Sequence, residues 1–323
     1  MRLAKKIWLI VAAALVFCGG ILFVCGMSVQ GWDFAALSTS QYETNEYTVQ
    51  EPFQHISVKT DTADLVFLPS DAEQISVTCF EQVNVKHTVT VRDDTLVVEA
   101  VDTRKWYEHI GLFFRNTSVT VYLPRGAYGA LSVDSDTGDV DIPKEFTFTS
   151  MDISESTGDV TSYADVSGTV KIRTDTGDIR VEGASAGALD LSVSTGDVTV
   201  SEVLCEGDMR IRVSTGKTKL TGVTCANFTS KGSTGDLSLQ NVVATGGFSI
   251  ERSTGDVKFS GCDAAEISVL TDTGDVTGTL LSEKVFITRT DTGDIRVPSS
   301  TTGGRCEITT DTGDIRISIV HGS

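Results

Sequence analysis

The string Asp-Thr-Gly begins at residues 136, 175, 272, 291 and 311, and the same string surrounds the catalytic aspartate of aspartic proteases. That mechanism needs two aspartates that share a proton across a cleft between two lobes. Here the string recurs in register with Ser-Thr-Gly, as in STGDV at 156–160 and at 194–198. We therefore interpret it as part of a repeated turn and not as a protease site.

Cleavage of acidic polysaccharides is a second chemistry that aspartates support on β-helical proteins. It uses aspartate pairs or calcium, together with basic residues, in a groove walled by long loops. The repeats of this chain have constant length, which leaves no insertion to wall a groove. Its histidines (His55, His87, His109 and His321) show no grouping for general acid and base roles. The sequence therefore predicts that the protein is not an enzyme.

Cysteine and histidine do not form a metal-binding pattern in the sequence. Five cysteines follow residue 27, and none belongs to a CxxC or a Cys/His spacing; they are Cys79, Cys205, Cys225, Cys262 and Cys306. An odd number cannot pair completely, so we interpret them as small buried side chains.

Carboxylates leave one possibility for a metal. Asp134, Asp136 and Glu145 match three places of a calcium loop, but Asp139 stands where that loop needs glycine. Three successive repeats near the end instead have aspartate on both sides of Thr-Gly. We expect this cluster to hold a weakly bound divalent cation such as Ca²⁺, and we expect no other cofactor; its residues are Asp272, Asp275, Asp291, Asp294, Asp311 and Asp314.

A repeat of 19 or 20 residues must position these side chains. Its turn glycines are Gly138, Gly158, Gly177, Gly196, Gly216, Gly235, Gly255, Gly274, Gly293 and Gly313. The period is too short for helical repeats, and apolar residues alternate around each glycine as they do in a strand with one buried face. We predict an all-β fold, a parallel β-helix or β-solenoid of about ten rungs, with each glycine at the positive φ of a type II turn. An unpaired edge is expected at the C-terminal end.

We divide the chain into three parts. Residues 1–27 are a short cytoplasmic stub and a transmembrane anchor, residues 28–134 are a β-rich N-terminal cap and transition, and residues 135–323 are the repeat domain. The middle part holds one degenerate motif copy, Asp61-Thr62-Ala63-Asp64. It also holds an aromatic segment, residues 105–114, for which both a capping plug and a loop that contacts a ligand or the membrane remain open.

Charge and hydropathy place the chain at a membrane. Residues 7–27 carry no charge and have the length of a membrane-spanning helix. The basic residues Arg2, Lys5 and Lys6 precede them, so the N-terminus should lie in the cytoplasm and the remainder outside, in a single-pass arrangement. A cleaved signal peptide is the alternative. The formal net charge of -18 argues against nucleic acid as a partner.

The apolar N-terminal segment, VTVYLPRG at 119–126 and the STGDV and DTGDI repeats together resemble a bacterial putative-adhesin family of unknown function. This family includes LiaG-like and YvlB-like β-helical envelope proteins. The resemblance implies a β-helical fold and a role in adhesion or cell-envelope stress, and it brings no catalytic residues.

Two functions therefore stay open for this chain. An adhesin would bind a surface glycan or a protein ligand along the rod, whereas a regulatory protein of the envelope stress response would act on a membrane signalling partner.

Overall fold

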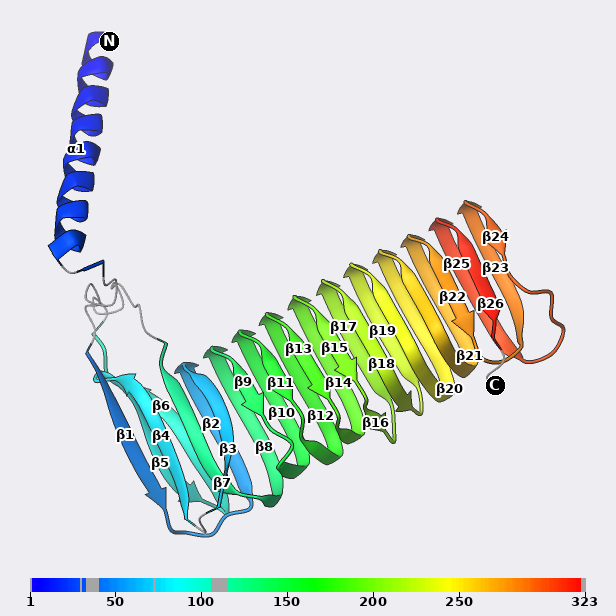
Figure 1. The fold of residues 1–323 in the computed structure, drawn as a ribbon, viewed down its shortest axis with the longest axis horizontal. Coiled ribbons are helices and arrows are strands. Elements are labelled where there is room, and N and C mark those ends of the chain that lie inside the picture. The colour runs from blue at the N-terminus through cyan, green and yellow to red at the C-terminus, as the bar shows by residue number, and fades with distance from the viewer. Residues whose placement is uncertain (1, 30, 33–40, 72–73, 106–115, 321–323) are drawn as a thin grey trace.

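The computed structural model describes residues 2–29, 31–32, 41–71, 74–105 and 116–320. The chain starts with helix α1 (Arg2–Val29) and continues as strands that all belong to one hydrogen-bonded sheet. That sheet winds into a long solenoid, and α1 stands apart from it (Figure 1). The predicted fold, a β-solenoid of about ten turns behind one apolar helix, is confirmed. Most of the aromatic segment at 105–114 lies outside the described residues.

Each rung of the solenoid consists of a long strand, the Thr-Gly-Asp turn, and a second strand. Parallel pairing is in register, so Thr137, Thr157 and Thr176 of successive turns stack on one another. The regular part comprises β8 (Gly126–Thr137), β9 (Val140–Ile142), β10 (Phe146–Thr157), β11 (Val160–Ser162), β12 (Asp165–Thr176), β13 (Ile179–Glu182), β14 (Ser185–Thr195), β15 (Val198–Ser201), β16 (Leu204–Cys205), β17 (Met209–Thr215), β18 (Thr218–Cys225), β19 (Phe228–Thr234), β20 (Leu237–Thr254) and β21 (Val257–Thr273).

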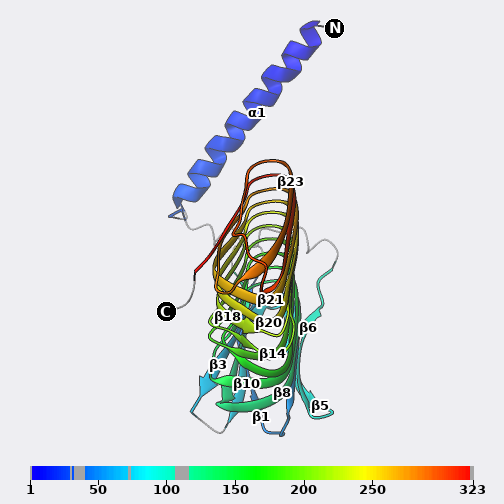
Figure 2. The ribbon, with the colours of Figure 1, turned by 90° about the vertical axis from the view of Figure 1, so that its right-hand side faces the viewer.

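Alternation along the strands builds the core. Every second side chain points inward, and Val, Ile, Leu and Phe fill one continuous apolar stack along the rod. The ring of Phe248 contacts Phe228 of the previous rung and Phe259 of its own rung, with centroids 5.8 and 6.3 Å apart. Turned by 90°, the ribbon shows the successive rungs as a series of narrow loops (Figure 2).

The turn glycines are needed for two reasons. Their φ angles lie between 128° and 156°, a region that L side chains rarely adopt. This φ differs from the roughly +80° that the type II turn of the sequence analysis would require. A Cβ on Gly235 would also lie 2.0 Å from the carbonyl oxygen of Gly216 on the rung below. The stacked backbones approach so closely that only glycine fits between them.

At the N-terminal end, antiparallel strands close the solenoid. β4 pairs antiparallel with β1 and β7, and β5 pairs antiparallel with β6. The degenerate motif around Ala63 forms a true rung, because β2 and β3 stack in parallel on β8 and β9. The strands of this end are β1 (Tyr42–Val49), β2 (His55–Thr62), β3 (Asp64–Ser70), β4 (Ile75–Gln82), β5 (Val85–Arg92), β6 (Thr95–Asp102) and β7 (Ser118–Pro124). The domain boundary expected at residue 135 stays a prediction.

At the C-terminal end, the order of rungs in space differs from their order in the chain. The last two strands stack directly on β21 and β22, and the pair that precedes them in the chain lies outermost. Figure 1 shows the red strands inside the orange ones. The strands concerned are β22 (Val276–Leu280), β23 (Lys284–Thr292), β24 (Ile295–Arg296), β25 (Gly304–Thr312) and β26 (Ile315–Ile319). The expected unpaired edge therefore belongs to β23 and β24 and not to the final strand.

Candidate functional site

The aspartate that closes each motif forms a ladder along one edge of the solenoid. The backbone N–H of Asp159 donates to Oδ1 of Asp139 (2.9 Å), and the N–H of Asp178 donates to Oδ1 of Asp159 (2.7 Å). The pattern continues at Asp197 and begins at Asp64, whose Oδ1 accepts from Asp139. Each carboxylate is thus compensated by the amide of the next rung. This confirms the turn amides as one source of the compensation that such closely stacked charges require.

Lys217 interrupts the ladder. Its own N–H donates to Oδ1 of Asp197 (2.7 Å), but its side chain offers no carboxylate to Asp236 on the next rung. The column resumes where the N–H of Asp256 donates to Oδ1 of Asp236 (3.1 Å). One rung therefore lacks the bond that its neighbours share.

The six aspartates of the expected cation site do lie on three neighbouring rungs. In space the rung of Gly313 lies between the rungs of Gly274 and Gly293. Asp314 donates its N–H to Asp275 (2.8 Å), and Asp294 donates its N–H to Asp314 (2.7 Å). Arginines pair with three of the six carboxylates, as Arg289–Asp291, Arg296–Asp294 and Arg316–Asp314. Asp272 and Asp311 lie exposed at the start of their motifs. Cation binding here stays a prediction.

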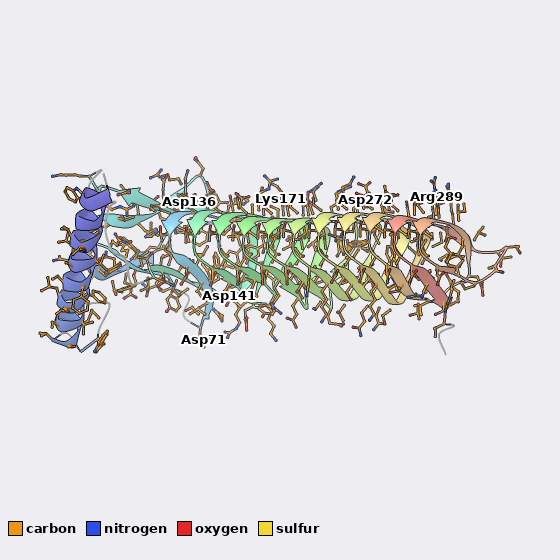
Figure 3. All side chains as sticks on the ribbon, turned by 90° about the horizontal axis from the view of Figure 1, so that it is seen from above. Asp71, Asp136, Asp141, Lys171, Asp272 and Arg289 are labelled. Carbon is orange, nitrogen blue, oxygen red and sulfur yellow. The ribbon has the colours of Figure 1, made fainter. Side chains whose placement is uncertain are left out.

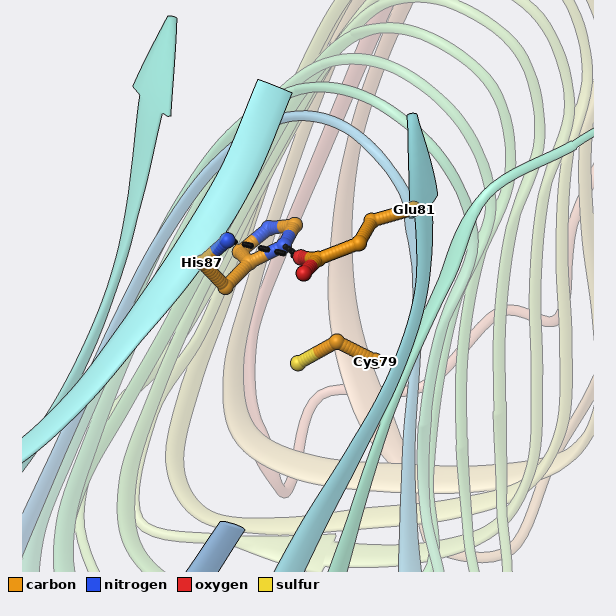
Figure 4. Close-up of side chains that lie close together, drawn as sticks. All are labelled: Cys79, Glu81 and His87. Atoms are coloured by element: carbon orange, nitrogen blue, oxygen red, sulfur yellow. Dashed lines mark hydrogen bonds and ion pairs between the residues drawn. The ribbon is translucent and has the colours of Figure 1, made fainter. Parts of the chain in front are cut away.

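The structure gathers a second cluster that the sequence analysis missed. Cys79, Glu81 and His87 are all buried in the N-terminal cap, and one ligand-type atom from each lies within 4.8 Å of the others. Oε2 of Glu81 accepts from the backbone N–H of His87 (2.6 Å) and lies 2.7 Å from its Nδ1 (Figure 4). On the other side of the ring, Nε2 of His87 lies 3.1 Å from Oγ1 of Thr60.

Local strand geometry explains this grouping. Cys79 and Glu81 alternate along β4 and therefore face the same side, and a two-residue connection returns the chain so that β5 brings His87 opposite them. The histidine then reaches Thr60 on β2, the first solenoid rung. The i, i+2 spacing of Cys79 and Glu81 was the one sequence signal, and it matches no metal or catalytic motif. No histidine was paired with an acid from the sequence, whereas the structure places His87 beside Glu81.

The cluster suits a structural role better than a chemical one. Burial and the charge of Glu81 raise the pKa of the Cys79 thiol to about 12, so the thiol is not a nucleophile. The adjacent cavity, lined partly by Thr60, Glu81 and His87, has a volume of about 20 Å³, which is room for a single water. Zn²⁺ accepts these three ligand types, but both imidazole nitrogens are already engaged. The chain of contacts from Glu81 through His87 to Thr60 fixes the cap to the solenoid.

Polar residues also interrupt the apolar core at one column, three residues before each turn glycine. Arg252 is 3% exposed in this column, and its side chain occupies the space that a Cβ on Gly232 would fill. It donates to Oγ of Ser230 (2.8 Å) and to Oγ1 of Thr218 (3.2 Å), and burial lowers its pKa to about 10. Small residues on two rungs therefore make room for this guanidinium.

Glu155 occupies the same column and is 2% exposed. Neither carboxyl oxygen makes a hydrogen bond of good geometry among the described residues, and the nearby Ser135 side chain and Thr157 backbone offset only part of the effect of burial on its pKa. Desolvation raises the pKa of Glu155 to about 7. The folded protein therefore binds a proton here at pH values where the unfolded chain has released it.

We expect Glu155 to make stability fall as pH rises. Since its pKa is about 7 in the folded state and 4.5 in the reference state, stability should decline between these values and stay reduced above pH 7. The full loss is about 3 kcal/mol. Glu155→Gln cannot ionise, so its melting temperature should exceed that of the wild type at pH 8 and approach it at pH 4.5. If the melting temperatures of variant and wild type differ by the same amount at both pH values, ionisation of Glu155 is not the cause.

The family described as Toastrack DUF4097 matches residues 53–212 and 204–322, which is most of the chain. The chain belongs to the Toastrack DUF4097 family. The matched segments of this Toastrack protein begin just before β2 and run through the solenoid to β26, so they exclude α1 and β1.

Solved structures similar to this Toastrack chain include a putative adhesin from Parabacteroides merdae ATCC 43184, with 15% identity and a TM-score of 0.45 over 75% of this chain and 97% of that one. A putative lipid binding protein from Parabacteroides distasonis ATCC 8503 has 13% identity and a TM-score of 0.43 over 87% and 98%. A putative adhesin from the same strain has 9% identity and a TM-score of 0.39 over 84% and 98%. No curated protein matches the chain.

Proposed function

We propose that this Toastrack protein is a non-catalytic, membrane-anchored rod that binds other surfaces outside the cytoplasm, as an adhesin does. The observation that carries the proposal is the in-register stacking of the rungs. Because partners such as Asp152, Lys171 and Asp190 stand directly above one another, outward side chains form straight columns along the whole rod. Figure 3 shows such side chains, including Asp136, Lys171 and Asp272, along the rod.

The outer columns offer charge and shape to a partner. Exposed ion pairs join adjacent rungs, as in Lys171–Asp152 (2.9 Å), Arg212–Asp190 (2.8 Å) and Lys231–Glu251 (2.7 Å). Exposed pairs of this kind contribute little to stability, so a partner can replace them at little cost. A groove of about 390 Å³ lies over the last of these pairs. An extended glycan or polypeptide of regular repeat suits such a surface better than a small substrate does.

The anchor completes the proposal. Residues Ile10–Val29 form a helical stretch of 20 residues with mean hydropathy 2.5, long enough to cross a bilayer. Arg2, Lys5 and Lys6 precede it and no lysine or arginine follows until Lys59, so the positive-inside rule favours residues 1–6 in the cytoplasm and the solenoid outside. The rod then projects from a single membrane span.

One experiment tests both anchoring and binding. Protoplasts that carry the full chain should attach to surfaces coated with cell-wall polysaccharide or envelope protein more than protoplasts without it do. Added protease should degrade the solenoid and abolish the attachment. Attachment that survives complete digestion, or full protection of the chain from protease, would reject the proposal.

Regulation of an envelope stress response is the alternative function. It predicts that the full chain co-purifies with a membrane signalling protein and that protoplast attachment is the same with and without the chain.

A further inference from the structure

The outermost rung, β23 and β24, exposes a row of unpaired backbone groups. β23 pairs with β25, and β24 pairs with β26. Among the described residues, no register joins either strand to a second strand. Proteins usually cover such an edge because it is a template for another strand.

The core is uncovered at the same end. Ile295 continues an inward column formed by Val276 and Ile315, which are both 0% exposed, yet Ile295 itself is 43% exposed. Phe286 likewise continues the column of Ile267 and Cys306 but is only partly buried. An apolar surface therefore lies between the two free strand edges.

The exchanged order of rungs keeps this edge in place. A strand at a chain terminus frays easily, but β23 and β24 are connected to the chain at both ends. Oγ1 of Thr290 donates to the carbonyl oxygen of Gly313 (3.0 Å), and the N–H of Asp294 donates to Oδ1 of Asp314 (2.7 Å). The open edge is thus a preformed surface with defined spacing.

We propose that this end binds the same end of a second copy of the chain. A two-fold axis perpendicular to both sheets would set β23 antiparallel to its copy and β24 antiparallel to its copy, and it would bring the two open cores face to face. The other end of the solenoid is closed by antiparallel strands β1, β4 and β5, so a head-to-tail stack does not match. A two-fold contact is also the commonest way in which identical chains associate.

Charge favours this partner as well. The chain carries a net charge of -18, which opposes contact between most of its surfaces. Residues 284–297 hold three basic and two acidic side chains, in contrast to the acidic rest. Arg289 pairs with Asp291, and Arg296 with Asp294, within the rung. Two such ends can meet without net repulsion between their carboxylates.

The pairing deepens the proposed function, since it names a second copy of the chain as the partner. It does not require that the solenoid lie outside the cytoplasm.

Full-length chain in nanodiscs, one copy per disc, tests the pairing directly. Light scattering behind size exclusion should show a particle of doubled mass as concentration rises. Negative-stain images should show a disc at each end of one straight rod of double length. Failure of the protoplast experiment with success here would reject the orientation or the adhesion but keep the pairing.

Two lysine substitutions on the same rung provide a matched comparison. Ile295→Lys places a charge in the proposed interface, where it would be buried without a partner, so pairing should weaken at least about 100-fold. Ile287→Lys changes a side chain of similar exposure (48%) that stands in an outward column, and pairing should persist. Single discs at every concentration, or equal pairing by both variants, would overturn the proposal.

A second comparison targets the strand edge. Inward-facing residues direct their N–H toward the open end of the rod, as Leu189 does to Asp208 O (3.0 Å) and Ile315 to Asp294 O (2.9 Å). Thr288 of β23 continues the inward column of Ile308, so its N–H points to the open side. Thr288→Pro should block pairing and leave the melting temperature near that of the wild type. Thr288→Ala removes the same side chain but keeps the N–H, and it should still pair. Rods joined side by side, or pairing by Thr288→Pro, would contradict an edge-to-edge contact.

Discussion

Replacing Gly235 with alanine should lower the free energy of unfolding by about 3 to 5 kcal/mol. The φ of Gly235 is 128°, which strains any side chain, and the new Cβ would lie 2.0 Å from the carbonyl oxygen of Gly216. Relief requires the two rungs to separate, which breaks hydrogen bonds such as Gly216 N–H to Thr234 O (2.9 Å). Thermal or denaturant unfolding followed by circular dichroism measures the loss.

Gly183 is the matched control for this substitution. Its φ is also positive, at 60°, but no atom lies within 4 Å of a Cβ at that position. Gly183→Ala should therefore cost only about 1 kcal/mol, the penalty for the backbone conformation alone. Similar losses in the two variants would show that close stacking of the rungs does not set the requirement for glycine.

Replacing His87 with alanine should destabilise the protein by about 3 kcal/mol or more, because a buried carboxylate loses its partner. Glu81 is 0% exposed, and the His87 ring is one of its few contacts in the cap, together with Asn45 Nδ2 (2.7 Å). The contact from His87 to Thr60 on the first rung would be lost as well. Hydrogen exchange should show the greatest loss of protection in β4, β5 and β2.

A double variant separates the effect of the Glu81–His87 contact on stability from the effect of side-chain packing. If Glu81 is costly only when unpaired, Glu81→Met combined with His87→Leu should be less destabilising than His87→Ala alone. A loss in the double variant equal to or greater than that of His87→Ala would mean that packing of the ring matters more than its contact with Glu81.

The repeat region was predictable because its signal is periodic. Glycines at a spacing of 19 or 20 residues, with apolar residues alternating on either side, define both the rung and its inward face. The order of the last rungs was not predictable, because the DTGD turns around Gly274, Gly293 and Gly313 have the same local sequence. Local sequence determines how a rung turns, whereas the choice of neighbour depends on long-range pairing.

For the candidate sites, too, the features set by the repeat were predictable and those set by long-range contacts were not. The aspartate ladder was visible as a column, since residues at equal positions of a repeat must stack. The cluster of Cys79, Glu81 and His87 was not, because it depends on one hairpin and on the contact of that hairpin with Thr60. The polar column around Glu155 and Arg252 also has no sequence signature, since the residues there share a position but not a chemistry.

The exchange of rungs also bears on how the protein matures during synthesis. During synthesis, β23 and β24 emerge before β25 and β26. The DTGD turn between β23 and β24 can stack on β21 and β22 as well as the turn of β25 and β26, which are their native neighbours, can. A nascent chain can therefore stack β23 on β21 in a non-native register, burying the same edge. The final strands must then open that contact and insert between two rungs, so the last step of folding is the replacement of a misplaced neighbour. Such a step is a kinetic trap of the kind that slows large β-proteins.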